Sequence, residues 1–367
     1  MRSTRITLAG LLFMLLCSPA FGQSSPILGA KAYRAVREPK QLVGFAKSLG
    51  LNTLFVGDEL AASLPFREQC RAAGLKYFVI IRTFNDPEAA KADPTLVSID
   101  REGRPARRAD DVMICPSRAD FRHAKLEQIR AAIERLKPDG VTLDYFRFFI
   151  YWEGVAPRTG PVDFPAFCFD RSCLHDFLTS TGLNVRHPNV GDALDANREL
   201  IDEIWGEHRD AWYGWRVRRI AENAREFTGF IRKESPRLPI VLHTVPWTRS
   251  EFGGAREKIV GQDFRLLAPF FDYVSPMAYS ALTRRGPGWV GKLDRELLTE
   301  VPAAKLLPSI EVGPDGPEFP PMSAVHYESD LQAALKQPAG VVLYHLELLL
   351  EDAKKQAITK RLLVPRP

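Results

Sequence analysis

The sequence contains neither a long apolar run that could cross a membrane nor a strong excess of one charge. The apolar stretch near its start, Leu8–Leu16, is far shorter than the roughly 20 residues that span a bilayer. The formal net charge is +5 over 367 residues, and the basic residues are spread along the chain. We therefore expect no stable membrane insertion and no nucleic acid partner.

Several catalytic motifs are also missing. The sequence has no Gly-x-Ser-x-Gly elbow, no Gly-x-x-x-x-Gly-Lys-Ser/Thr loop and no His-Glu-x-x-His helix. These absences argue against a serine hydrolase, a nucleotide triphosphatase and a zinc protease. The histidines show no metal-ligand spacing, so the sequence predicts neither a metal site nor a cofactor.

Cysteine is scarce, with five residues, and Cys17 lies in a segment typical of a secretion signal. Met1–Gly22 combines basic residues, an apolar core and Ala20-Phe21-Gly22 as a small-x-small cleavage site. We interpret it as a cleaved signal peptide, so the protein is expected to be exported and to be periplasmic or secreted. The remaining residues, 23–367, have the length of one large α/β barrel domain.

The four remaining cysteines are an even number, which permits disulfide bonds in an exported protein. Cys168 and Cys173 are close enough in sequence to pair locally, and Cys70–Cys115 is the second candidate bridge. A zinc site would need further ligands at short spacing, and only His175 lies near. A disulfide or free thiols are therefore favoured over zinc.

The composition, 45% hydrophobic and 26% charged, is that of a folded protein. Eight short apolar or β-branched runs alternate with helical patterns, and near-continuous apolar character is typical of buried parallel strands. The eight runs are Ile27–Tyr33, Asn52–Gly57, Lys76–Ile81, Gly140–Tyr145, Pro239–Thr244, Asp272–Tyr279, Lys305–Val312 and Gly340–Glu347. Eight strand–helix units in one chain predict a (β/α)8 TIM barrel.

Two predicted connections are much longer than the others. Arg82–Asp120 follows the third strand, and an insertion at about residues 146–197 follows the fourth. Both leave the carboxyl ends of strands, which is the face where such barrels build their active sites. The helical pattern at Arg198–Lys233 is too long for a normal barrel helix and is compatible with two helices.

Asp144 ends the fourth predicted strand. Alternation on a barrel strand points every second side chain inward, and an unpaired carboxylate there is expensive to desolvate. Arg147 is close enough in sequence to hold Asp144 ionised and lower its pKa. The position favours a functional role for Asp144, whereas the alternative is a buried Asp144–Arg147 pair that only stiffens the loop.

The segment Asp139–Phe148, DGVTLDYFRF, resembles the DGxHxDYxRYP-type strand of a glycosyl-hydrolase-like TIM-barrel family of exported bacterial proteins. Further segments agree in order, and the resemblance covers about residues 116–279. They are Cys115-Pro116-Ser117, the cysteine-containing insertion Phe167–Phe177, Trp215-Arg216 at the start of a long helix, and Gly261–Phe264 leading into Asp272–Tyr279, which is similar to a DxxSPMxY strand.

The sequence departs from that family at two positions. Phe148 replaces a tyrosine, and Asp170 stands where relatives often carry another cysteine. The second departure argues further against a metal ion.

The resemblance implies glycoside hydrolysis, which needs two carboxyl groups across the sugar bond, and it implies Asp144 as the nucleophile. For the acid/base partner we predict Glu311, because its apolar strand would raise its pKa towards that of a useful acid. Other carboxylates on the same face are the alternatives: Asp58, Glu153, Glu251 and Glu347.

Sugar sites also need aromatic and hydrogen-bonding side chains. The predicted substrate-binding residues follow strand ends and are Tyr145, Arg147, His243, Trp247, Tyr279 and Glu347. The sequence thus predicts a glycoside hydrolase with a carbohydrate substrate. The alternative is a catalytically silent barrel that binds glycan or cell-envelope material, since a fold alone does not establish activity.

Overall fold

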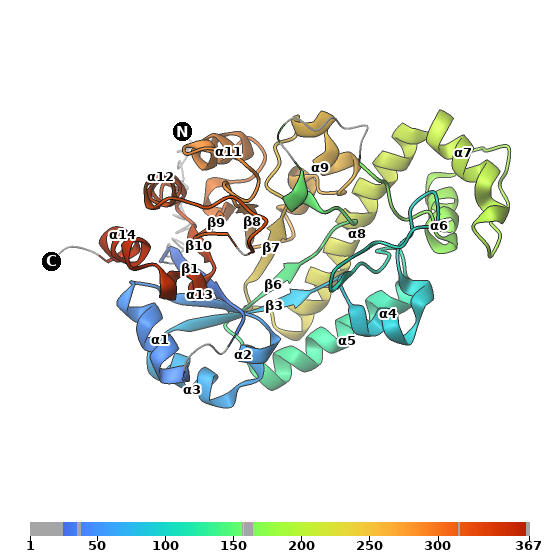
Figure 1. Cartoon of the computed structure of the whole chain (residues 1–367). Helices are drawn as coiled ribbons and strands as arrows, with labels where there is room; N and C mark the ends of the chain where they lie inside the picture. The colour runs from blue at the N-terminus through green and yellow to red at the C-terminus, as the bar shows by residue number, and fades with distance from the viewer. Residues whose placement is uncertain (1–24, 35–37, 156, 158–163, 315, 365–367) are drawn as a thin grey trace, which may run out of the picture.

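The computed structural model describes residues 25–34, 38–155, 157, 164–314 and 316–364, so the predicted signal segment Met1–Gly22 lies outside the described residues. Eight parallel strands close into a barrel in the order β1-β10-β9-β8-β7-β6-β3-β2 (Figure 1). They are β1 (Ile27–Ala32), β2 (Thr53–Val56), β3 (Lys76–Arg82), β6 (Gly140–Asp144), β7 (Ile240–Thr244), β8 (Tyr273–Ala278), β9 (Ser309–Glu311) and β10 (Gly340–Tyr344). The predicted (β/α)8 barrel is confirmed, and each predicted run contains one barrel strand or overlaps it closely.

A helix follows every barrel strand before the next strand begins. These helices are α1 (Pro39–Ser48), α3 (Leu64–Ala72), α5 (Ala119–Leu136), α8 (Arg209–Glu234), α10 (Phe264–Leu267), α11 (Trp289–Leu297), α12 (Ala324–Ala334) and α14 (Ala353–Leu363). In α5 the spacing of Leu126, Ile129 and Leu136 puts all three side chains in the core. Among the helices that the structure describes, none is both long and apolar enough to span a bilayer.

The two long connections leave the carboxyl ends of β3 and β6, as predicted. The first holds α4 (Pro87–Ala92) and the hairpin β4 (Arg107–Arg108) with β5 (Asp111–Val112). The second holds α6 (Arg171–Thr181), and α6 and the helix that follows it, α7 (Arg198–Glu207), extend to one side of the barrel (Figure 1). The predicted long helix is two helices, because the backbone of His208 leaves the helical region and separates α7 from α8.

The interior of the barrel is apolar towards the amino ends of the strands. Phe55 and Phe78 pack with their ring centroids 5.2 Å apart and belong to a cluster with Ile80, Val241, Leu307 and Val342. Glycine makes room for them: a Cβ on Gly29 would lie 2.7 Å from Phe55, and one on Gly140 would lie 2.5 Å from Phe78. The two bulky rings therefore depend on two strand glycines.

The predicted disulfides are not formed. Cys70, Cys115, Cys168 and Cys173 are all free and buried. Cys70 lies in the core between α3 and the barrel, whereas Cys115 lies in a different cluster, so that bridge was predicted wrongly. Cys168 and Cys173 are not bonded either, because Cys173 is in the first turn of α6 and both sulfurs approach Cys115.

Candidate active site

A polar layer lies above the apolar interior, at the carboxyl ends of the strands. Asp144 ends β6, and its Oδ2 atom lies 3.3 Å from Nδ1 of His243 on β7. Lys31 of β1 is 1% exposed; its Nζ atom lies 3.4 Å from that same Nδ1 and donates to Tyr279 at 2.9 Å. Strand alternation thus brings a carboxylate, an imidazole and an ammonium group from three strands to one point.

Electrostatics keep Asp144 ionised at this point. Burial alone would raise its pKa, but His243, Lys31 and the backbone N–H of Tyr145 together hold the pKa of Asp144 well below its usual range. Burial lowers the pKa of Lys31 to about 8, although Asp144 opposes the fall. Burial and Lys31 lower the pKa of His243 to about 4. Near neutral pH the layer therefore holds an aspartate anion, a lysine cation and a neutral histidine.

Two tyrosines form a wall beside Lys31. The rings of Tyr279 and Tyr344 stack with centroids 4.4 Å apart, and Lys31 Nζ lies 5.6 and 5.5 Å from them. Tyr33 meets Tyr344 edge to face at 6.1 Å. A cation against aromatic faces is stabilised in a site from which water is largely excluded.

A small hollow of about 260 Å³ lies at the side chain of Tyr145, the residue that follows Asp144. Its walls include Arg108, Asp111, Tyr145, Arg147, Tyr151 and Glu153. Tyr145 has a left-handed backbone, with φ of 51°, and its hydroxyl donates to Asp111 Oδ2 at 3.0 Å. A non-glycine residue in that conformation is uncommon and is often found at functional sites.

Glu153 lines this hollow together with Asp111, and its carboxyl group also interacts electrostatically with Asp144. Burial raises the pKa of Glu153 to about 7; Asp111 and Asp144 add to the rise, and Arg147 opposes it. A carboxyl group with that pKa is protonated in a large fraction of molecules near neutral pH and can serve as a general acid. Asp144 and Glu153 are thus two carboxyl groups whose environments drive their pKa values apart.

Glu311 has the raised pKa that the sequence analysis predicted, but its carboxylate is already engaged. It is 1% exposed and accepts from the backbone N–H groups of Ala281 and Leu282. Burial raises its pKa to about 7, and these two N–H groups oppose the rise. The acid/base role of Glu311 remains a prediction, with Glu153 as its competitor.

The structure separates the predicted substrate-binding residues into two groups. Tyr145, Arg147, His243 and Tyr279 lie around Asp144 and the hollow. Trp247 is 2% exposed and packs against Phe252 with ring centroids 4.9 Å apart, which is a core position and does not offer an open ring face.

Glu347 is held at the rim of the barrel. Its Oε1 atom accepts from the backbone N–H of Tyr33 at 2.7 Å, and Oε2 lies 2.8 Å from His345 Nδ1. These contacts fix the loop that follows β1, so they position the tyrosine wall. Direct binding of substrate by Glu347 remains a prediction.

The predicted Asp144–Arg147 pair is not formed. Arg147 instead donates to the carbonyl groups of Phe148 and Ile150 and lies 5.3 Å from the ring of Tyr145. The left-handed turn at Tyr145 directs the chain away after β6, so proximity in sequence does not become contact. Lys31 and His243 take the role that the sequence analysis gave to Arg147.

Lys31 is not among the site residues predicted from the sequence. The available signal was a single lysine in the apolar run Ile27–Tyr33, since a charge inside a buried strand requires a partner. Nothing in the sequence pointed to Asp144, which lies more than a hundred residues later, as that partner.

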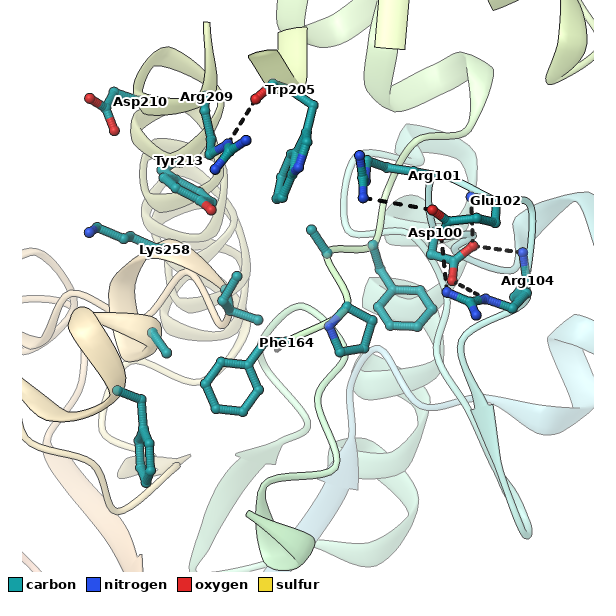
Figure 2. A pocket seen from close by; sticks show the side chains of 16 residues that line it. Asp100, Arg101, Glu102, Arg104, Phe164, Trp205, Arg209, Asp210, Tyr213 and Lys258 are labelled. Carbon is teal, nitrogen blue, oxygen red and sulfur yellow. Dashed lines mark hydrogen bonds and ion pairs between the residues drawn. The ribbon is translucent and has the colours of Figure 1, made fainter. Parts of the chain in front are cut away.

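A larger cavity, of about 940 Å³, lies between the two insertions, the adjoining parts of α7 and α8, and the segment after β7 (Figure 2). Phe164, Trp205, Tyr213 and Phe252 supply aromatic surface to it. Trp205, on α7, is flanked by Arg101 and Arg209, whose guanidinium carbons lie 4.7 and 4.6 Å from its ring centroid (Figure 2). Aromatic rings combined with charged side chains suit a polyhydroxylated ligand.

No protein-family model matches the chain, and no curated protein matches it either. Solved structures of glycoside hydrolases do share its fold. The glycoside hydrolase domain of PgaB (BpsB) from Bordetella bronchiseptica has a TM-score of 0.67 at 11% identity, covering 93% of this chain and 99% of that one.

Two further neighbours are hydrolases with other substrates in their names. A GH42 β-galactosidase from G. stearothermophilus has a TM-score of 0.59 at 13% identity, covering 94% of this chain and 58% of the enzyme. A chitinase from Chromobacterium violaceum has a TM-score of 0.51 at 11% identity, covering 94% of this chain and 100% of that one. At such identities the likeness establishes a glycoside-hydrolase-like barrel fold.

Proposed function

We propose that the protein is an exported glycoside hydrolase that acts on a poly- or oligosaccharide, with Asp144 as nucleophile or electrostatic stabiliser. The observation that carries the proposal is the ionised Asp144 at the carboxyl end of β6, held by Lys31 and His243. Glycoside hydrolysis passes through an oxocarbenium-like transition state, and a fixed anion beside the sugar ring stabilises it. No cofactor is required for this chemistry.

We assign Glu153 as the general acid that protonates the leaving oxygen. It lines the hollow at Tyr145 and interacts electrostatically with Asp144, and its raised pKa keeps a proton available near neutral pH. Glu311 is the competing assignment, and its two bonds from backbone N–H groups weigh against it.

Export is part of the proposal and rests on Met1–Gly22. Sequencing the amino terminus of the protein isolated from its host tests it. We expect the mature chain to begin at Gln23, and a chain that retains Met1 in the cytoplasm would contradict export.

The experiment that tests the activity is a screen of aryl glycosides and polysaccharides, followed by Asp144→Asn. We expect Asp144→Asn to lower the turnover per folded molecule by on the order of 10²-fold or more. Asp139→Asn is the matched control, because Asp139 lies before the same strand at its opposite end and accepts from Tyr77 N–H at 3.0 Å. Full activity of folded Asp144→Asn, or no hydrolysis by the wild type, would leave the silent glycan-binding barrel as the better description.

A further inference from the structure

Three cysteines and one aspartate converge where the two insertions meet. The ligand atoms of Cys115, Cys168, Asp170 and Cys173 all lie within 4.8 Å of one another. Cys115 precedes α5, whereas Asp170 caps α6 and Cys173 lies in its first turn. All three thiols are buried, at 1% exposure or less.

The sulfur separations require an explanation. The Cys115 sulfur lies 3.6 Å from that of Cys168 and 2.7 Å from that of Cys173. Two thiolates on one tetrahedral zinc ion are about 3.8 Å apart, since each Zn–S bond is about 2.3 Å long. The Cys115–Cys168 separation is close to that value. The Cys115–Cys173 separation is shorter, and it fits either two thiolates that move apart around a shared ion or a covalent bond.

Asp170 distinguishes these two explanations. Its Oδ1 atom accepts from the backbone N–H of Cys173 at 3.1 Å and caps α6, but Oδ2 is buried without a hydrogen-bond partner. A buried carboxylate oxygen without a partner is costly. A Cys115–Cys173 disulfide would leave that oxygen without a partner and Cys168 as a free thiol. One metal ion, in contrast, binds all four side chains.

The surroundings suit an anionic cluster. Arg216 is fully buried next to it and donates to the carbonyl groups of Phe167 and Ile259. Among the described residues no carboxylate forms a salt bridge with Arg216, so its charge is free to balance thiolates. The hydroxyl of Ser98 lies 3.0 Å from the Cys168 sulfur, in the place of a group that hydrogen-bonds a metal-bound sulfur.

We infer that Cys115, Cys168, Cys173 and Asp170 bind a single zinc ion that joins the two insertions. Thiolate ligands favour zinc over magnesium and calcium, and four protein ligands with no open position are the mark of a structural site. This inference revises the prediction that the protein binds no metal, and it does not depend on the proposed hydrolase activity.

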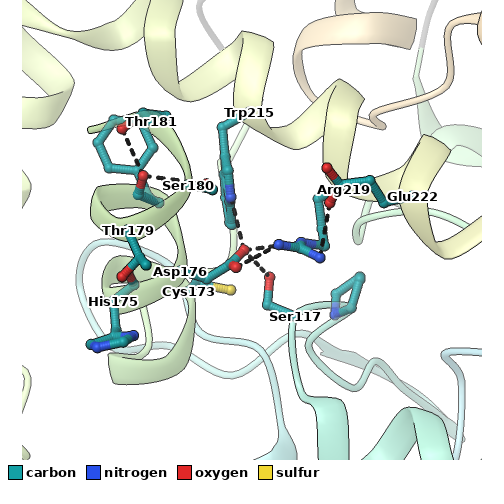
Figure 3. A network of polar contacts seen from close by, with 12 residues as sticks. Ser117, Cys173, His175, Asp176, Thr179, Ser180, Thr181, Trp215, Arg219 and Glu222 are labelled. Atoms are coloured by element: carbon teal, nitrogen blue, oxygen red, sulfur yellow. Dashed lines mark hydrogen bonds and ion pairs between the residues drawn. The ribbon is translucent and has the colours of Figure 1, made fainter. Parts of the chain in front are cut away.

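A polar network beside the cluster holds two of the ligands in place (Figure 3). Asp176 of α6 accepts from Trp215 and Arg219 of α8, at 2.9 Å each, and Ser117 donates to it at 3.4 Å. Cys173 lies beside this network on α6 (Figure 3), and Ser117 is two residues from Cys115. The network therefore preorganises the cluster from both insertions.

The test begins with the mature protein, residues 23–367, purified without chelators. Elemental analysis is expected to give about one zinc ion per chain, as a single four-ligand site requires. Thiol titration after denaturation in chelator should then find Cys70, Cys115, Cys168 and Cys173 all reactive. A protein without zinc overturns the inference, and the loss of two thiols together with two hydrogens in the intact mass would identify a disulfide instead.

Variants identify the ligands. Cys168→Ser and Asp170→Ala should each weaken zinc binding, measured by competition with a chromogenic chelator, by on the order of 100-fold or more. Asp170→Cys should retain the ion, and Cys70→Ser is the matched control because that buried thiol lies in another part of the core. Zinc retained at full affinity by both ligand variants would contradict the assignment.

A second measurement covers the case in which a variant fails to fold. Wild-type protein stripped of zinc and loaded with Co²⁺ should show intense thiolate-to-cobalt charge-transfer absorption and the visible bands of a tetrahedral ion. Cobalt binding without the charge-transfer absorption would exclude the cysteines as ligands and overturn the inference.

Discussion

Lys31 supplies the positive charge of the polar layer, and its removal should be visible at His243. In Lys31→Met, burial of the imidazole remains but the neighbouring cation is gone, so the pKa of His243 should rise from about 4. Histidine titration by NMR measures the change. Lys305→Met is the control, since Lys305 donates to the carbonyl groups of Ala268 and Phe271. An unchanged His243 titration in Lys31→Met would show that the cation does not control this imidazole.

The raised pKa of Glu153 predicts how kcat/KM depends on pH. A general acid must be protonated to act, and burial raises the pKa of Glu153 to about 7, so kcat/KM should fall as the pH rises through about 7. In Glu153→Gln, kcat/KM should no longer fall as the pH rises through about 7. The variant should keep most of its activity on aryl glycosides whose leaving groups need no proton.

Glu311→Gln is the matched comparison, because burial raises the pKa of Glu311 to about 7 as well. If Glu153 is the acid, Glu311→Gln keeps the alkaline limb of the pH profile. If kcat/KM no longer fell at alkaline pH in Glu311→Gln but still fell in Glu153→Gln, Glu311 would be the general acid and Glu153 would not.

Asp144 could be proposed as a site residue from the sequence because it lies at the end of an apolar strand. Its partners did not follow, because contacts across a barrel join residues far apart in the chain. Arg147 was chosen by proximity in sequence, whereas the left-handed turn at Tyr145 separates the two side chains. Lys31 and His243 reach Asp144 through the order of the strands, which the sequence alone does not give.

The barrel strands themselves make a stability prediction. Gly140→Ala places a methyl group 2.5 Å from the Phe78 ring, and such overpacking should lower the free energy of unfolding by about 1–3 kcal/mol. Gly229→Ala is the control: this glycine lies inside α8 with nothing within 4 Å of an added Cβ, and alanine there should add about 0.5–1 kcal/mol. Chemical denaturation measures both, and equal effects of the two changes would refute the packing argument.

The strands were predictable because parallel strands covered on both faces are nearly continuous apolar runs, such as Tyr77–Ile81. The cysteine pairing was not predictable. Only four residues lie between Cys168 and Cys173, but α6 begins there, capped by Asp170, and both sulfurs lie close to Cys115. Spacing along a chain does not reveal such a change of direction at a helix start.

In the whole molecule, the cavity beside α7 offers a place for the distant part of a long substrate. On the proposed function, Trp205→Ala should raise KM for long oligosaccharides several-fold and leave kcat for the shortest aryl glycoside unchanged. Trp289→Ala is the control, because Trp289 also has a guanidinium over its ring, from Arg285 at 5.4 Å, but lies on α11 outside the cavity. If Trp205→Ala changed KM equally for long and short substrates, Trp205 would have no role in binding the distant part of the substrate.

The paired rings of Phe55 and Phe78 determine from which end of the barrel a ligand can enter and leave. With Val241, Leu307 and Val342 they fill the barrel interior below Asp144, so the amino-terminal end of the barrel offers no route to that residue. On the proposed function, reactant, water and product must then all reach and leave Asp144 from the carboxyl ends of the strands. A bound product would block the next reactant, and product inhibition should follow competitive kinetics.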